Sequence, residues 1–379
     1  MEVDTTYELA IVGGGLAGLA LSIQIVREGY KVILFEKEQY PFHRVCGEYI
    51  SLESWGFLQK LGVDLESLNV SQIKRLCVSA MNGRSFEQEL PLGGFGISRY
   101  KLDHTLVQIA KQNGVIVYEQ TRVNDIRFSE GYFTIESSKG NFKARVAAGC
   151  HGKRSNLDVK WKRPFIVAKK NKLNNYIGIK YHIQYNFPDD LIALHNFKKG
   201  YCGISKVEGD QYCLCYLTTA DNLQHSENDI KKMEQTVLSA NPHLKKIFNE
   251  CKMVRDEPVI ISQISFDKKE LVEDHVLMIG DAAGMITPLC GNGMSMALHA
   301  SKIAAEKTQA FLKGTISREL MEQNYSSDWK KNFQNRMRAG RMLQRLFNND
   351  GLTTLIITLG RSFPVMIRTL VRKTHGSPF

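Results

Sequence analysis

The stretch YELAIVGGGLAGLALSIQIVREGYKVILFEKE, residues 7–38, decides the fold class of this chain. Apolar residues 9–12 lead directly into a run of glycines, and residues 16–26 carry apolar side chains at helical spacing. A second apolar and β-branched run covers residues 31–36. Strand, tight turn, helix and strand in this order begin a parallel α/β sheet.

The glycines at the head of the predicted helix form the pattern G-x-G-x-x-G, at Gly13, Gly15 and Gly18. Gly13 permits the tight turn, Gly15 lets the backbone approach a pyrophosphate, and Gly18 lets the helix pack against the strand. The free N–H groups of the helix N-terminus then face the phosphates. Glu36 ends the second strand, where a carboxylate accepts ribose hydroxyls and disfavours a 2′-phosphate. Together these features predict a Rossmann-like dinucleotide site that does not take NADP.

The remainder of the chain shows two kinds of pattern. Residues 101–113 predict an amphipathic helix, 115–118 a buried strand, and 123–148 a three-stranded antiparallel meander. Residues 176–218 predict a separate antiparallel sheet, and residues 275–284 return to a buried strand before long helical patterns. This order implies two interleaved domains. The predicted parts are a nucleotide-binding domain (1–73, 100–159, 271–320), a substrate domain (74–99, 160–270) and a basic helical C-terminal region (321–379).

Positive charge is concentrated at the C-terminal end. The chain has a net charge of +11, and residues 330–379 contain ten Lys or Arg against one acid, Asp350. The rest is close to neutral, so we expect no nucleic-acid partner. Residues 336–373 place cations, such as Arg338, Arg341 and Arg345, among apolar residues at helical spacing. This pattern fits either a helical layer on the nucleotide domain or peripheral contact with an anionic membrane.

The sequence also carries expectations about location and metals. The acidic N-terminus enters an apolar strand within ten residues and lacks the basic flank of a signal peptide, so we expect a cytoplasmic protein. No apolar run approaches the roughly 18 residues that a membrane span needs. The eight cysteines are scattered, which predicts reduced thiols, and the His and Cys spacings predict no metal site.

A second glycine-rich turn lies in IGDAAGMITPLCGNGMSMALHASKIAAE, residues 279–306. Here the sequence resembles the flavoproteins that unite aromatic-ring hydroxylases, geranylgeranyl reductases and flavin halogenases. Their second FAD motif, G-D-A-A-G/H followed by P-x-x-G-x-G, is matched by Gly280, Asp281, Ala282, Ala283, Gly284, Pro288, Gly291 and Gly293. The resemblance implies FAD as the cofactor, with Asp281 on the ribityl chain. It also implies that residues 291–294 and the following helix start face the flavin's pyrimidine end, where a helix N-terminus stabilises negative charge. A dehydrogenase with NAD in the first site is contradicted by this motif.

The loop RVCGEYIS, residues 44–51, follows the strand that ends at Glu36. In the resembled family this loop runs along FAD, and reductase-like members carry a Cys-Gly pair there. The resemblance implies that Arg44 meets the pyrophosphate, that Gly47 allows approach to the isoalloxazine, and that Cys46 lies near the flavin's reactive face. For Cys46, a catalytic redox or proton-donor role and a packing role both stay open. The other implied FAD contacts are Leu16, Ala17, Lys37, Val123, Met294 and Arg99, which begins an R-x-x-L-D motif ending at Asp103.

One position departs from the family pattern. In AAGCHGKRSNLD, residues 147–158, His151 stands where the family usually has the Asp of a D-G pair. That Asp commonly links FAD and nicotinamide contacts. His151 and Arg154 either substitute for it as donors or form only a loop beside the cofactor domain. We expect NADH or NADPH as the electron donor, and its recognition stays open.

Two reactions stay open. One is hydride transfer from reduced flavin to a C=C bond of an apolar isoprenoid, lipid or polyketide-like molecule, which the RVCGE loop and Gly284 favour. The other is hydroxylation of an aromatic or polyketide substrate with NAD(P)H and oxygen. The halogenase branch is disfavoured because its W-x-W-x-I-P signature is absent. A flavin-binding module that only assembles with partners at a membrane is the non-enzymatic alternative.

The substrate cavity has one predicted wall. Residues 200–217 resemble the sheet that floors the substrate cavity in the superfamily. The alternating Tyr201, Ile204, Tyr212, Leu214 and Tyr216 suit an apolar ligand. A sheet that packs a core shows the same pattern, so both interpretations stay open.

Overall fold

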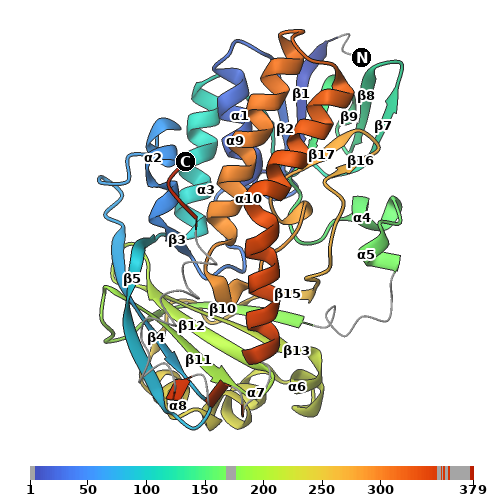
Figure 1. Cartoon of the computed structure of the whole chain (residues 1–379). Helices are drawn as coiled ribbons and strands as arrows, with labels where there is room; N and C mark the ends of the chain where they lie inside the picture. Colours follow the sequence, from blue (N-terminus) through green and yellow to red (C-terminus); the bar gives the residue numbers. More distant parts are fainter. Residues whose placement is uncertain (1–4, 168–175, 348–350, 352, 355–356, 359–375) are drawn as a thin grey trace.

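The computed structural model describes residues 5–167, 176–347, 351, 353–354, 357–358 and 376–379. Within these residues the chain forms an eight-stranded sheet and a nine-stranded sheet, with the long helix α10 (Arg318–Phe347) running past both (Figure 1). The predicted α/β fold, a Rossmann-like domain interleaved with a largely antiparallel domain and followed by helices, is confirmed.

The first sheet is built on the N-terminal strand–helix–strand unit. Strand β1 (Thr6–Val12) lies between β2 (Val32–Phe35) and β9 (Gly140–Gly149) and is parallel to both. The order is β16-β17-β9-β1-β2-β6, in which β6 is Ile116–Tyr118, β16 is Val272–Glu273 and β17 is Val276–Met278. Gly149 at the end of β9 pairs with Val12 of β1 and with Met278 of β17. The carboxyl ends of these three strands therefore meet at one end of the sheet.

Helices cover this sheet (Figure 1). Helix α1 (Leu16–Val26) has nine of its eleven residues buried and packs against α3 (Arg99–Gln112) and α9 (Gly293–Leu312). Helix α10 packs on α9 through a buried stripe of side chains spaced four apart, namely Met321, Tyr325, Trp329, Phe333 and Met337. Residues 318–347 thus form the packed helical layer, whereas Arg361, Arg368, Arg372 and Lys373 lie outside the described residues.

The second sheet has the order β14-β10-β13-β12-β11-β4-β5-β3, with β15 beside β10. All its pairs are antiparallel except β4 with β11. Its strands are β3 (Tyr49–Ser51), β4 (Ser71–Ser79), β5 (Ser85–Gly96), β10 (Tyr176–Gln184), β11 (Leu191–Phe197), β12 (Gly200–Lys206), β13 (Tyr212–Thr219), β14 (Lys252–Met253) and β15 (Val259–Ile264). One face packs on α7 (Ile230–Thr236) and α8 (Pro242–Glu250), which follow α6 (Ala220–His225). The opposite face of the second sheet is therefore the one that can pack against the first domain.

Shorter elements join the two sheets. Strands β7 (Val123–Ser129), β8 (Tyr132–Ser137) and β9 form the predicted antiparallel meander. Helices α2 (Trp55–Lys60), α4 (Asn156–Lys160) and α5 (Pro164–Val167) lie in the connections. The predicted domain boundaries stay a prediction; β3, which they assign to the nucleotide domain, pairs with β5 in the second sheet. Among the described residues, no helix has both the length and the apolar character to cross a bilayer.

Candidate cofactor and substrate site

A cavity of about 900 Å³ is lined by both domains. Its walls include the carboxyl ends of β1, β2 and β9, the loop before β3, the start of α9, and strands β11 to β13. Every predicted cofactor residue except Gly18 lines it: Gly13, Gly15, Leu16, Ala17, Glu36, Lys37, Arg44, Cys46, Gly47, Arg99, Val123, Gly280, Asp281, Pro288, Gly291, Gly293 and Met294. The structure thus brings together residues from four distant parts of the sequence.

The first glycine turn has the shape that phosphate binding needs. Gly13 has φ +107°, and a Cβ there would lie 2.4 Å from the carbonyl oxygen of Cys150. A Cβ on Gly18 would lie 2.1 Å from the oxygen of Gly13, so Gly18 serves close helix–strand packing and does not face the cavity. No side chain caps the amides at the start of α1. These N–H groups are available to an anion, because the first turn of a helix leaves its donors unpaired.

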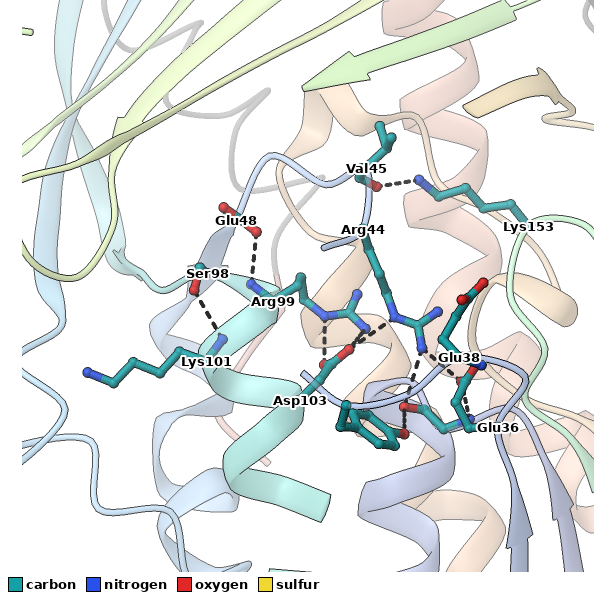
Figure 2. A network of polar contacts seen from close by, with 12 residues as sticks. Glu36, Glu38, Arg44, Val45, Glu48, Ser98, Arg99, Lys101, Asp103 and Lys153 are labelled. Carbon is teal, nitrogen blue, oxygen red and sulfur yellow. Dashed lines mark hydrogen bonds and ion pairs between the residues drawn. The ribbon is translucent and has the colours of Figure 1, made fainter. Parts of the chain in front are cut away.

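Glu36 lies at the end of β2 as predicted and is only 3% exposed. Its carboxylate accepts hydrogen bonds from the backbone N–H groups of Gly14 (2.9 Å) and Glu38 (3.1 Å). Arg44 also donates to Glu36 (2.9 Å) and to Asp103 (3.1 Å), so its guanidinium lies between two acids (Figure 2). The predicted pyrophosphate contact of Arg44 stays a prediction.

The R-x-x-L-D motif opens α3. Ser98 caps the helix by accepting from the N–H of Lys101, and Arg99 forms a bidentate pair with Asp103 at 2.8 Å for both bonds (Figure 2). Asp103 therefore receives two guanidinium groups, one from Arg99 and one from Arg44. The pair with Arg99 lies within α3, whereas the pair with Arg44 fixes α3 against the loop that precedes β3.

Sequence reasoning missed a buried ion cluster beside this loop. Glu48 is fully buried, and its carboxylate accepts from Lys180 Nζ (2.7 Å), His182 Nε2 (2.5 Å) and the N–H of Arg99 (2.8 Å). Burial alone would raise the pKa of Glu48, but Lys180 and His182 hold it at about 2. Burial and the positive charge of Lys180 lower the pKa of nearby His43 to about 4.

A signal for this cluster exists in the sequence. Glu48 belongs to the RVCGE loop itself, and Lys180 and His182 alternate with apolar residues along β10. Polar side chains at every second position of a strand share one face of the sheet. Glu48, His182 and Cys213 also place ligand atoms within 4.8 Å of one another, a spacing that can hold a metal. Because Lys180 already neutralises Glu48 and burial raises the pKa of the Cys213 thiol, we interpret the group as an ion-pair cluster.

Cys46 and Gly47 precede Glu48 in this loop, and all three line the cavity. Cys46 is half-buried, lines the cavity and accepts a hydrogen bond at its carbonyl oxygen from Cys213 Sγ (3.3 Å). Lys153, in the loop that follows β9, donates to the carbonyl oxygen of Val45 at 3.0 Å (Figure 2). The loop that holds Cys46 is therefore fixed on both sides by hydrogen bonds to its backbone.

Two buried cations hold the second glycine-rich turn. Arg163 has no exposed side-chain surface and donates to the carbonyl oxygen of Ala282 (3.1 Å), while Lys269 donates to that of Asp281 (2.8 Å). Burial is the main cause that lowers the pKa of Lys269, to about 8. Helix α9 begins at Gly293 without a side-chain cap, so its first amides are also available to a ligand.

The five predicted wall residues lie on two faces of the second sheet. Residues 201 and 204 have opposite parity along β12, so their side chains point to opposite faces. Ile204, Tyr212, Leu214 and Tyr216 belong to the core against α7 and α8, which is the packing interpretation. The other face places Tyr201 in an apolar cluster with Tyr176, Leu217, Ile264, Phe266, Met285 and Leu289. From this cluster Tyr201 and Leu217 line the cavity, and Ile204 and Tyr216 are also among its lining residues.

The fold and this site define an FAD-binding flavoprotein. The two strand–turn–helix units leave two uncapped helix starts on one cavity, and an acid ends β2, as FAD requires. Residues 6–339 match the family described as FAD binding domain, and the chain belongs to this family. The protein is therefore an FAD-dependent oxidoreductase, as the sequence predicted.

The relatives of this chain carry different functional names. The chain is 25% identical to the conditioned medium factor receptor 1 of Dictyostelium discoideum, covering 87% of this chain and 68% of the relative. It is 23% identical to a digeranylgeranylglycerophospholipid reductase of Methanococcus vannielii, covering 92% of this chain and 89% of the relative. Other relatives are named as hydroxylases, monooxygenases or halogenases. A solved flavin-dependent brominase shares the fold, with a TM-score of 0.78 at 17% identity over 97% of this chain and 93% of that one.

Proposed function

We propose that this protein binds FAD across the carboxyl ends of β2, β1, β9 and β17 and reduces a carbon–carbon double bond in an apolar isoprenoid, lipid or polyketide-like molecule. The observation that carries the proposal is the apolar wall of the cavity. Tyr201, Leu217, Ile264 and Met285 line it and belong to one buried apolar cluster. An apolar ligand gains free energy there by leaving water.

Strand order supports one direction for the proposed cofactor. The adenosine end lies at β2, where Glu36 accepts ribose hydroxyls, and the pyrophosphate lies at the turn after β1. The ribityl chain and ring system then extend toward β17 and the start of α9. When bound, the flavin supplies a hydride to one alkene carbon while a proton completes the other, and NADH or NADPH restores its electrons.

The protein's own residues position the cofactor and enclose the cavity. The cluster of Glu48, Lys180 and His182 ties the loop of Cys46 to β10 of the second sheet. The amides of α9 favour negative charge at the ring system. Cys46 is the proposed catalytic candidate because it lines the cavity on this loop and is half-buried.

The product mass tests the reaction. The FAD-loaded protein is reduced with NADH or NADPH without oxygen and incubated with geranylgeraniol, and the product is analysed by mass spectrometry. A gain of two hydrogens per double bond supports the proposal. An unchanged lipid, together with oxygen incorporation into an aromatic acid under air, would replace it by the monooxygenase alternative, which the hydroxylase relatives favour.

We also propose that the basic C-terminal region makes peripheral contact with a membrane. On α10, Arg338, Met342 and Arg345 are exposed together, and Met342 is 63% exposed. Each cation near an anionic bilayer contributes about 1 kcal/mol. Salt-sensitive sedimentation with anionic liposomes, lost in Arg338→Glu/Arg345→Glu and on deletion of residues 351–379, supports this contact. No sedimentation at low salt would contradict it.

A further inference from the structure

The second sheet borders the cavity along a row of three residues from the neighbouring strands β11, β12 and β13 (Figure 1). Leu194 of β11 pairs directly with Gly203 of β12, and Gly203 pairs directly with Cys215 of β13. All three residues line the cavity. Direct register partners lie on the same face of a sheet, so the row is continuous, with Gly203 at its centre.

These three residues keep accessible surface where their neighbours do not. Gly203 is half-buried, whereas every other residue from 200 to 205 is buried. Cys215 is likewise half-buried while the other residues from 212 to 218 are buried, and Leu194 is half-buried as well. The row is therefore a part of the cavity wall that a ligand can reach.

Packing within the protein does not require a glycine at position 203. Gly203 does not have a positive φ, and a Cβ there would lie 3.4 Å from Leu194 Cδ2 and 3.7 Å from the carbonyl oxygen of Cys215, which are ordinary contacts. Other strand glycines of this sheet differ, because a Cβ on Gly96 or Gly200 would lie 1.7 Å or 2.4 Å from its nearest neighbour. A glycine inside a strand weakens the strand and often marks a close approach by a ligand.

We propose that Gly203 determines which substrates fit this cavity, because its missing side chain leaves the space over the centre of the row to the substrate. This inference rests on the apolar substrate proposed above. It assigns to the substrate a contact surface on the second sheet, at the backbone of β12.

The two ends of the row differ in chemistry. On the β11 side, Leu194 packs against the buried apolar cluster that contains Phe86, and so does Ile192, which also lines the cavity. On the β10 side, Cys215 pairs with Lys180, which is bound to Glu48. An apolar chain that crosses Gly203 therefore extends toward β11, where it leaves water without displacing an ion pair.

Calorimetric titration of the oxidised, FAD-loaded protein with geranylgeraniol tests this contact without turnover, because no reductant is present. Gly203→Ala should weaken geranylgeraniol binding at least roughly fivefold, the effect of one overpacked methyl group, and Gly203→Val should weaken it further. FAD affinity should stay at the native value, and the melting temperature should not fall, since the added Cβ meets only ordinary contacts. The alanine variant decides the question if the larger valine disturbs the sheet.

The matched control is Gly56→Ala in α2, where nothing lies within 4 Å of the added Cβ and the residue does not line the cavity. This variant should bind geranylgeraniol and FAD as the native protein does.

Three results would overturn the inference. Unchanged geranylgeraniol affinity in Gly203→Ala would show that the substrate does not use this space. FAD affinity that falls in parallel would assign the row to the cofactor. No binding to the native protein would remove the inference together with the apolar substrate. If Gly203→Ala weakens binding but the native protein leaves the double bonds of geranylgeraniol unreduced, the inference holds and only the proposed reaction fails.

Discussion

Substitution of Glu48 by Gln should destabilise the protein by about 3 kcal/mol at neutral pH. The environment lowers the pKa of Glu48 from 4.5 to about 2. Since one pKa unit corresponds to about 1.4 kcal/mol, this depression represents about 3 kcal/mol of preferential interaction with the ionised carboxylate. The same substitution leaves Lys180 buried and unpaired, a change that typically costs about 3–5 kcal/mol.

The contribution of Glu48 to the free energy of unfolding should depend on pH. Because the folded-state pKa of Glu48 is depressed, its contribution is present above about pH 4.5 and is lost as the pH falls toward about 2. The difference in unfolding free energy between the native protein and Glu48→Gln should therefore be largest at neutral pH and vanish near pH 2.

Denaturant unfolding at several pH values measures this difference. The control is Asp221→Asn, which removes the exposed pair with Lys199 and should cost less than about 0.5 kcal/mol. The double variant Glu48→Gln/Lys180→Met should recover part of the loss, because it no longer buries an unpaired cation. Equal losses for Glu48→Gln and Asp221→Asn, or a loss that does not change with pH, would refute the reasoning.

Five further substitutions concern the cofactor site. Glu36→Ala and Asp281→Ala should each reduce FAD occupancy on purification, because charge-assisted hydrogen bonds contribute about 1.5–3 kcal/mol; full flavin content in both variants would contradict the assignment. Gly47→Ala should leave the melting temperature unchanged, since nothing lies within 4 Å of the added Cβ. The same substitution should weaken FAD binding if the flavin approaches this backbone. Gly13→Ala should impair folding itself, because its Cβ would lie 2.4 Å from the carbonyl oxygen of Cys150. Cys46→Ser should alter the flavin absorption spectrum or its reduction rate with FAD still bound, and unchanged spectra and rates would leave Cys46 a packing residue.

Local patterns were sufficient for the first sheet and for both glycine turns. The apolar runs around Gly13 and Asp281 have fixed spacing from their glycines, so the strand, turn and helix could be located directly. Confirmation of the meander at residues 123–148 follows from the same two-residue period. These features depend on residues that are close in the sequence, so the sequence alone was sufficient to predict them.

Contacts between distant residues were not predictable in the same way. Glu48 and Lys180 are 132 residues apart in the sequence, and the residues of the RVCGE loop do not indicate that Lys180 is the partner of Glu48. The two faces of β12 could not be told apart, because Tyr201 and Ile204 are both apolar and only the position of α7 and α8 decides which face is covered. The ion pairs of Arg44 with Glu36 and Asp103 were likewise not predicted from the sequence, and its predicted pyrophosphate contact stays a prediction.

The attachment of the second glycine-rich turn has a consequence for how this molecule can be divided. Arg163 and Lys269, which hold the carbonyl oxygens of Ala282 and Asp281, both come from the segment that otherwise builds the substrate side. Neither half can therefore be expressed alone with a finished cofactor turn. Exchange of the substrate half for that of a relative would change flavin affinity unless both cations came with it. Selection for new substrates in this chain thus acts on its cofactor affinity as well.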